Sequence, residues 1–211
     1  MLDALVAFPR SGQTWIAYML AQATGLSVAK SDWFTELPKD QRFVRTHVMF
    51  DPKWPIRRAV YIRRNPDDVM RSVWKLKKLH GETLDYAPEQ LEERFVQFQH
   101  HWRTGPLTGP IPCCGNWWTH HDSWLQQTAV PLIVVEYEDA CRHPAHELRR
   151  ILNFFNLGVS DWVLQAAIRA GSLENLRQVE EQEIRERRHG WFFSMACERG
   201  YAKGYRFIRA V

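Results

Sequence analysis

FPRSGQTW, residues 8–15, is the stretch that determines how this chain folds. It follows the apolar run LVA and precedes the helix-like sequence IAYMLA at residues 16–21. A buried strand that turns through Pro and Gly into a helix N-terminus gathers backbone N–H groups around one small volume, where the positive helix end favours an anion. Arg10 adds a positive charge, while Ser11 and Thr14 add hydroxyl donors. The stretch therefore predicts a strand, a phosphate-binding loop and a helix.

The loop differs from the common nucleotide-binding pattern GxxxxGK[ST], because it lacks the first glycine and the lysine after the second. This difference argues against a kinase or a GTPase. The loop resembles instead the 5′-phosphosulfate loop of the PAPS-dependent sulfotransferases, whose pattern is close to YPKSGTTW. The differences are Phe8, Arg10 and Gln13. By this resemblance the residues that bind the nucleotide are Arg10, Ser11, Gly12, Gln13, Thr14 and Trp15, the last of which offers its ring to the purine.

A second motif lies further along the chain. The run AVYI at residues 59–62 predicts a buried parallel strand, and it continues into RRNPDDVMRSVW at residues 63–74, where Asn-Pro opens a helix. This resembles the family's 3′-phosphate motif RNPxDVxxS. The resemblance implies that Arg64 and Ser72 hold a second phosphate, although the same residues also suit a helix-start ion pair and a surface hydroxyl. Two phosphates on one nucleoside indicate PAPS as co-substrate and PAP as product.

A third match is the sequence VPLIVVEYED at residues 130–139, which predicts a buried strand ending in a Tyr-Glu-Asp turn, followed by a helix from about 142 to 155. The family has the same strand and turn. By this resemblance Tyr137 lies against the adenine. The sequence SLENL at residues 172–176 resembles the family's SFExM helix start, which implies that Leu173 lies beside the adenine.

The expected elements alternate along the chain. Strands are expected near 3–8, 43–46, 59–63 and 131–137, and helices near 14–23, 66–79, 89–103, 114–128, 142–155 and 160–169. This order predicts an α/β fold of three α/β/α layers with a central parallel sheet, and the resemblance implies the P-loop-nucleotide-hydrolase-like sulfotransferase fold. Because the chain has 211 residues and is 45% hydrophobic, we expect a single sulfotransferase domain over residues 1–211.

The candidate catalytic residues follow a predicted strand in the sequence RFVRTH at residues 42–47. It resembles the family's Lys-Thr-His pattern, whose histidine deprotonates the acceptor hydroxyl. His47 is therefore the candidate base, acting as the hydroxyl oxygen attacks sulfur in line. Arg10 and Arg45 stand where the family has lysines, and they would stabilise charge on the phosphosulfate. We expect no metal to be required.

The C-terminal part has no clean copy of the family's 3′-phosphate clamp, RKGxxG. Arg199 and Gly200, within RGYAKGYR, carry the right residue types with one residue too many between the glycines. The sequence RRHG, from Arg187 to Gly190, is a rival. The sequence leaves both open.

Charge patterning argues against several classes of partner. The net charge of +4 and the pI near 9.0 suit an anionic ligand, but the densest basic run, residues 185–189, follows the acidic run EEQE at 180–183 and predicts a solvated, charge-paired helix. We therefore expect no nucleic acid. Adjacent histidine pairs chelate poorly, so no zinc site is expected. Without an apolar run of about 18 residues or a signal-peptide pattern, we expect no membrane partner and a cytoplasmic location.

The acceptor is the part that the sequence defines least. Ten tryptophans and eleven phenylalanines favour an aromatic or apolar small molecule with a phenol or alcohol group, including a bulky natural product. Aromatic residues in the segments where the family builds its acceptor site are Trp33, Phe34, Phe50, Trp54, Trp74, Phe98, Trp102, Trp117 and Trp118. The alternatives are a nucleotide-dependent phosphotransferase and a non-catalytic PAP-binding module. A homodimer stays open.

Overall fold

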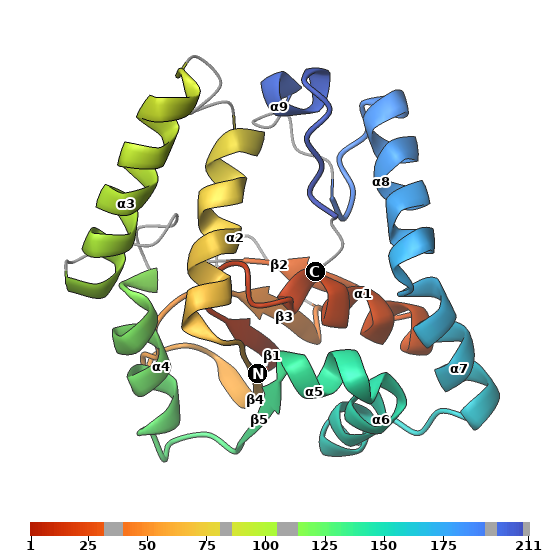
Figure 1. Cartoon of the computed structure of the whole chain (residues 1–211). Helices are drawn as coiled ribbons and strands as arrows, with labels where there is room; N and C mark the ends of the chain where they lie inside the picture. The colour runs from red at the N-terminus through yellow and green to blue at the C-terminus, as the bar shows by residue number, and fades with distance from the viewer. Residues whose placement is uncertain (32–39, 81–85, 105–113, 193–197, 209–211) are drawn as a thin grey trace. The chain divides into compact units, whose positions relative to one another are not determined.

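The computed structural model in Figure 1 describes residues 1–31, 40–80, 86–104, 114–192 and 198–208. The chain forms two compact units. The first comprises Met1–Val69 with Leu107–Ala170, and the second comprises Met70–Pro106 with Gly171–Val211. The single domain over residues 1–211 stays a prediction. Among the described residues, no helix has both the length and the apolar character needed to cross a membrane.

The first unit is built on a parallel β-sheet, as the sequence predicts. Its strands are β1 (Leu2–Ala7), β2 (Val28–Lys30), β3 (Phe43–Thr46), β4 (Ile56–Arg63) and β5 (Leu132–Glu136), in the order β2-β3-β1-β4-β5. Every residue of β1 is buried, which suits a central strand covered on both faces. The three-residue strand β2 at the sheet's edge is too short to have been predicted. This order brings the ends of β1, β3 and β4 together.

Helices cover both faces of this sheet (Figure 1). On one face, Trp124 of α4 (Trp117–Leu125) packs with alternate residues of β1 and with Val44. On the other, Phe43 contacts Phe155, directly after α6 (Pro144–Phe154), with ring centroids 5.3 Å apart. Helix α6 in turn contacts α1 (Gln13–Thr24) and α7 (Asp161–Ala170). The α/β layers expected from the alternating elements are therefore present.

Two helix boundaries differ from the expected ones for local reasons. The helix expected from about 142 to 155 is α6, which begins at Pro144 because proline cannot continue a helix but suits the first position of a new one, whereas the turn expected at residues 137–139 is the start of a short helix, α5 (Tyr137–Arg142). Helix α4 begins at Trp117 rather than 114, because Asn116 caps it by accepting from the backbone N–H of Thr119.

The second unit is helical. It contains α2 (Pro66–Leu79), whose first residues belong to the first unit, and α3 (Pro88–Thr104), α8 (Leu173–Glu186) and α9 (Glu198–Ala202). The ring of Trp74 on α2 lies 5.3 Å from that of Phe98 on α3. Helix α9 was not predicted, because five residues carry little periodicity.

The acidic face of α8 corrects the expectation of a solvated helix. Glu180 and Glu183 are only 1% and 2% exposed. Glu183 accepts from the backbone N–H groups of Trp191 and Phe192, and Glu180 accepts from those of Phe207 and Ile208. The carboxylates are buried because they pair with backbone donors that would otherwise be unsatisfied.

A buried carboxylate closes the amino end of the sheet. Asp3 on β1 is fully buried and accepts hydrogen bonds from Arg57 and Arg58, with Arg42 3.4 Å away. Arg42 and Arg58 also donate to the carbonyl of Phe155. Burial alone would raise the pKa of Asp3, but the two hydrogen-bonded guanidinium groups more than offset it and lower that pKa. This cluster ties β1, β3 and β4 to the end of α6.

We predict that Asp3→Asn lowers the free energy of unfolding by about 3 kcal/mol, because three guanidinium groups lose their counter-charge. Because the pKa of Asp3 is lower in the folded than in the unfolded protein, its carboxylate stabilises the fold at pH values above the unfolded-state pKa. This stabilisation is lost as the pH falls through the folded-state pKa, so the variant should also lose part of the acid dependence of stability. Chemical denaturation between pH 3 and 7 measures both effects.

The control is Asp139→Asn, which removes the exposed carboxylate that pairs with Arg142 at 3.0 Å. Exposed pairs contribute about 0–1 kcal/mol, so this variant should unfold almost like the unmodified chain. Equal stability of the two variants would contradict the role given to Asp3.

Candidate nucleotide and catalytic site

The loop at residues 8–15 connects β1 to α1 as the sequence predicts. Its backbone is left-handed at Arg10 (φ 72°) and Gly12 (φ 89°), and Gly12 precedes α1 without any side-chain cap. A Cβ at Gly12 would lie 2.3 Å from the ring of Tyr137. Glycine is therefore required twice, by the backbone angle and by the close approach of the ring. The uncapped N-terminus of α1 is suited to an anion.

Ser11 provides the clearest sign of a ligand in this loop. The residue is 1% exposed, and among the described residues its Oγ has no hydrogen-bond partner. A buried hydroxyl without a partner costs about 1–3 kcal/mol. An anion held by the loop would remove this cost.

The side chain of Gln13 joins two strands of the sheet. Its side-chain amide donates to the carbonyl of Leu5 at 2.9 Å and to that of Thr46 at 2.6 Å. The side chain therefore joins the ends of β1 and β3 beneath the loop, and its contact with the nucleotide stays a prediction.

Arg45 on β3 reaches the loop, and His47, directly after β3, reaches the end of β1. Arg45 donates from Nη1 to Thr14 Oγ1 at 2.9 Å, and His47 Nδ1 lies 2.7 Å from the carbonyl oxygen of Ala7. Because a carbonyl can only accept, His47 carries its proton on Nδ1 and its basic lone pair is on Nε2. This is the tautomer that a general base needs.

Arg64 comes from the end of β4 and reaches the same loop. It donates from Nη1 to the carbonyl of Arg10 at 3.1 Å, and its guanidinium lies 4.3 Å from the centre of the Tyr137 ring. Its buried Nε has no hydrogen-bond partner among the described residues. The ring of Trp15 meets Tyr137 edge-on at 5.9 Å. Gly12, Arg64 and Trp15 thus surround the Tyr137 ring, and burial raises the pKa of its phenol to about 12.

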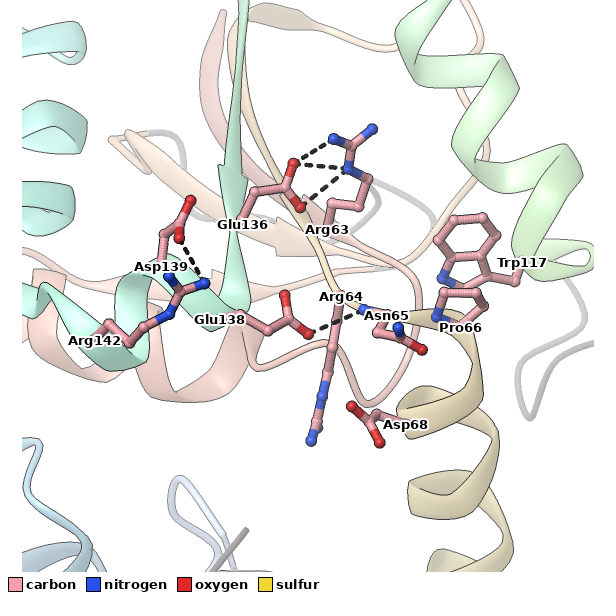
Figure 2. A pocket seen from close by; sticks show the side chains of 10 residues that line it. All are labelled: Arg63, Arg64, Asn65, Pro66, Asp68, Trp117, Glu136, Glu138, Asp139 and Arg142. Atoms are coloured by element: carbon pink, nitrogen blue, oxygen red, sulfur yellow. Dashed lines mark hydrogen bonds and ion pairs between the residues drawn. The ribbon is translucent and has the colours of Figure 1, made fainter.

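A cavity of about 480 Å³ borders Arg64 at the ends of β4 and β5 (Figure 2). Figure 2 shows Arg63 pointing toward Glu136, with which it forms a bidentate ion pair, while Arg64 extends away from them. The cavity is charged, with Trp117 as its aromatic wall. Its lining residues are Arg63, Arg64, Asn65, Pro66, Asp68, Trp117, Glu136, Glu138, Asp139 and Arg142.

The other predicted site residues belong to the second unit. Ser72 lies on α2, and Leu173 begins α8 and is 39% exposed. Since the two units are described separately, the contacts of Ser72 and Leu173 with the nucleotide stay predictions.

The two candidate clamps also lie in the second unit. Arg187 ends α8 in a left-handed conformation, and a Cβ at Gly190 would lie 2.0 Å from the Glu183 carboxylate. Arg199 lies on α9, although its side chain is outside the described residues. A Cβ at Gly200 would lie 2.0 Å from the carbonyl oxygen of Leu79. Close packing alone therefore explains why each position is a glycine, and the choice between the two candidate clamps stays open.

The aromatic residues suggested for the acceptor site have mixed environments. Phe50 and Trp54 pack against the core cluster of the sheet, whereas Trp118 is 42% exposed. Trp33 and Phe34 lie outside the described residues.

Sequence reasoning missed a buried residue of this region. His120 on α4 is fully buried and lies against Phe8 and Tyr61. Its spacing of four residues from Trp124, which puts both side chains on one face of a helix, could have marked it as inward-facing. Over the described ranges, no three His, Cys, Asp or Glu side chains form a group that could hold a metal ion.

Comparison with known proteins identifies the family of this chain. The family model described as the sulfotransferase domain matches residues 34–204. The chain belongs to the sulfotransferase family. The matched range includes β3, His47 and the Arg64 motif, while the loop at residues 8–15 precedes it.

Curated relatives of this sulfotransferase-family chain include a WSCD family member of Drosophila pseudoobscura pseudoobscura, 28% identical over 181 residues, covering 80% of this chain and 54% of the relative. Sulfotransferase 1B1 of Canis lupus familiaris is 26% identical over 206 residues, covering 83% of this chain and 66% of the relative. The chain therefore spans about half to two thirds of the length of these relatives.

Solved structures share the fold. Retinol dehydratase in complex with androsterone and PAP superposes with a TM-score of 0.70 at 18% identity, covering 99% of this chain and 73% of that one. Mouse sulfotransferase SULT7A1 complexed with PAP gives a TM-score of 0.64 at 18% identity, covering 83% of this chain and 66% of that one. The sulfotransferase α/β fold predicted from the sequence is confirmed.

We predict that Gly12→Ala lowers the free energy of unfolding by about 2–3 kcal/mol, because the new Cβ adds backbone strain and a clash with Tyr137. The matched control is Gly25→Ala, at φ 67° with nothing within 4 Å of the new Cβ, which should cost only about 1 kcal/mol. Thermal unfolding compares the two. Equal losses would mean that the Tyr137 ring moves aside freely.

Proposed function

We propose that this chain is a PAPS-dependent sulfotransferase that transfers a sulfuryl group to a hydroxyl of a small molecule. The observation that carries the proposal is the buried Ser11 Oγ without a partner, in a loop that the cations Arg45 and Arg64 reach from neighbouring strands. Membership of the sulfotransferase family supports it. Neither observation requires knowledge of the acceptor.

The residues present suit PAPS, which supplies the sulfuryl group. The uncapped start of α1 and the unsatisfied Ser11 hydroxyl suit its 5′ end, and Arg64, with its unsatisfied Nε, suits a phosphate. The proposed nucleotide-binding residues are Arg10, Ser11, Gly12, Gln13, Thr14, Trp15, Arg64, Ser72, Tyr137, Leu173, Arg199 and Gly200.

His47 is the proposed base. Its Nδ1–H is held by the Ala7 carbonyl, so Nε2 accepts the proton of the acceptor hydroxyl as that oxygen attacks sulfur. Arg10 and Arg45 stabilise the negative charge that develops on the leaving oxygen. Arginine stays protonated throughout, so both act electrostatically and neither acts as an acid.

The proposed acceptor is a small molecule with a phenol or alcohol group. The abundance of aromatic residues supports an aromatic or bulky apolar acceptor. The exposed side chain of Trp118 is one candidate for a residue that lines the acceptor site.

Calorimetry with PAP tests the nucleotide site without any acceptor. We expect micromolar or tighter binding of PAP and much weaker binding of ATP with Mg²⁺, because the site offers two phosphate-binding ends. Arg64→Ala should weaken PAP about 10- to 100-fold, the loss of hydrogen bonds to a charged group. The matched control is Arg63→Ala, since the neighbouring Arg63 is engaged by Glu136. A preference for ATP would instead favour a phosphotransferase.

His47→Ala tests the chemistry. We expect turnover with PAPS and a phenol panel to fall about 10²- to 10⁴-fold, the usual contribution of a general base, while PAP affinity changes less than about twofold. Unchanged turnover would reject His47 as base. Tight PAP binding without turnover for any acceptor would identify a non-catalytic PAP-binding module.

A further inference from the structure

A buried histidine that the proposed mechanism does not use lies beside the base. His120 on α4 has no exposed surface, and its Nδ1 lies 3.0 Å from the hydroxyl of Tyr61 on β4, itself 1% exposed. The ring of Phe8, at the start of the phosphate loop, meets it edge-on with centroids 5.7 Å apart. The imidazole is thus fixed by a strand, a helix and the loop together.

The protonation state of this ring follows from its surroundings. The titratable side chains that face it are Tyr61, His47 and His121. Burial lowers the pKa of His120 to about 3, and the neighbouring His47 acts in the same direction. Burial raises the pKa of the Tyr61 hydroxyl, which therefore keeps its proton and can donate it to Nδ1. A neutral ring that accepts at Nδ1 carries its proton on Nε2.

The Nε2–H group faces the chain segment that carries the base. Nε2 is buried and has no well-aligned hydrogen-bond partner within the described residues, while the backbone of His47 and Val48 lies against the ring. The same helix also holds this segment through Trp124, whose Nε1 donates to the Val48 carbonyl at 2.8 Å. Helix α4 therefore touches the segment at two neighbouring points.

We infer that His120 is a positioning residue for His47: Tyr61 fixes its tautomer, so that a neutral N–H group is directed at the backbone of residues 47–48. This holds the His47 ring with Nδ1 on the Ala7 carbonyl and Nε2 available as the basic nitrogen. A neutral group also avoids placing a second positive charge beside His47 when it takes the proton. The catalytic meaning of this inference rests on the proposed function.

Three variants test the inference. Tyr61→Phe removes only the donor to Nδ1, His120→Gln keeps an N–H group near the place of Nε2, and His120→Leu keeps volume without any donor. We expect kcat to fall about 10- to 100-fold in Tyr61→Phe and His120→Leu, with His120→Gln recovering most of it, because small misplacement of a base is costly. KM and PAP affinity should change less than about twofold.

Nuclear magnetic resonance of histidine-labelled protein gives a readout independent of activity. We expect His120 to stay neutral with its proton on Nε2 from pH 5 to 8, and the Nδ1–H signal of His47 to change in Tyr61→Phe. The matched control is Tyr201→Phe, which removes another buried tyrosine hydroxyl, bonded to the Phe192 carbonyl at 3.0 Å. It should lower thermal stability without moving the His47 signal.

The outcomes separate this inference from the proposed function. Failure of the unmodified chain to bind PAP or turn over PAPS would reject the proposed function, and the His47 signals would still decide whether His120 positions that ring. Unchanged His47 signals in Tyr61→Phe and His120→Leu would overturn the positioning role. The positioning role would also be overturned if His120→Gln and His120→Leu lost activity equally and in proportion to their loss of thermal stability.

Discussion

The site depends on one buried side-chain amide. Gln13 donates to the carbonyl of Leu5 on β1 and to that of Thr46 on β3, so the loop, the central strand and the neighbouring strand β3 are joined at one point. The Thr46 carbonyl belongs to the residue directly before His47. The Gln13 side chain therefore couples the position of the loop to that of the candidate base, together with the hydrogen bonds of Arg45 to Thr14 and of His47 to the Ala7 carbonyl.

The cations of this site are engaged with the loop. Arg45 bonds the Thr14 hydroxyl, and Arg64 bonds the Arg10 carbonyl while stacking on Tyr137. A planar guanidinium can hold such a contact and still present N–H groups in other directions, which an ammonium on a flexible stem does less well. Arg45, which stands where the family pattern has a lysine, thus has its charge placed by a contact within the protein.

The sequence predicted the parts of the structure that depend on local patterns. The loop at residues 8–15 and the strand endings that carry His47 and Arg64 follow from apolar runs that stop at turn residues, and α/β alternation predicted the sheet. Tertiary contacts decided the rest. The burial of Glu180 depends on backbone donors far along the chain, and His120 faces inward because α4 packs on the sheet. The backbone donors bound by α8 and the sheet residues that pack on α4 lie elsewhere in the chain, so the local sequence of either helix does not indicate them.

Helix α8 holds two later segments of its unit in a way that does not depend on what their side chains are. Glu183 and Glu180 each bind two successive backbone N–H groups, at residues 191–192 and 207–208, and every amino acid except proline offers that group. These contacts constrain the backbone of the held segments alone, whereas the side chains of Phe192 and Phe207 are constrained separately by their packing. The helix therefore sets the path of the chain without specifying which side chains that path presents.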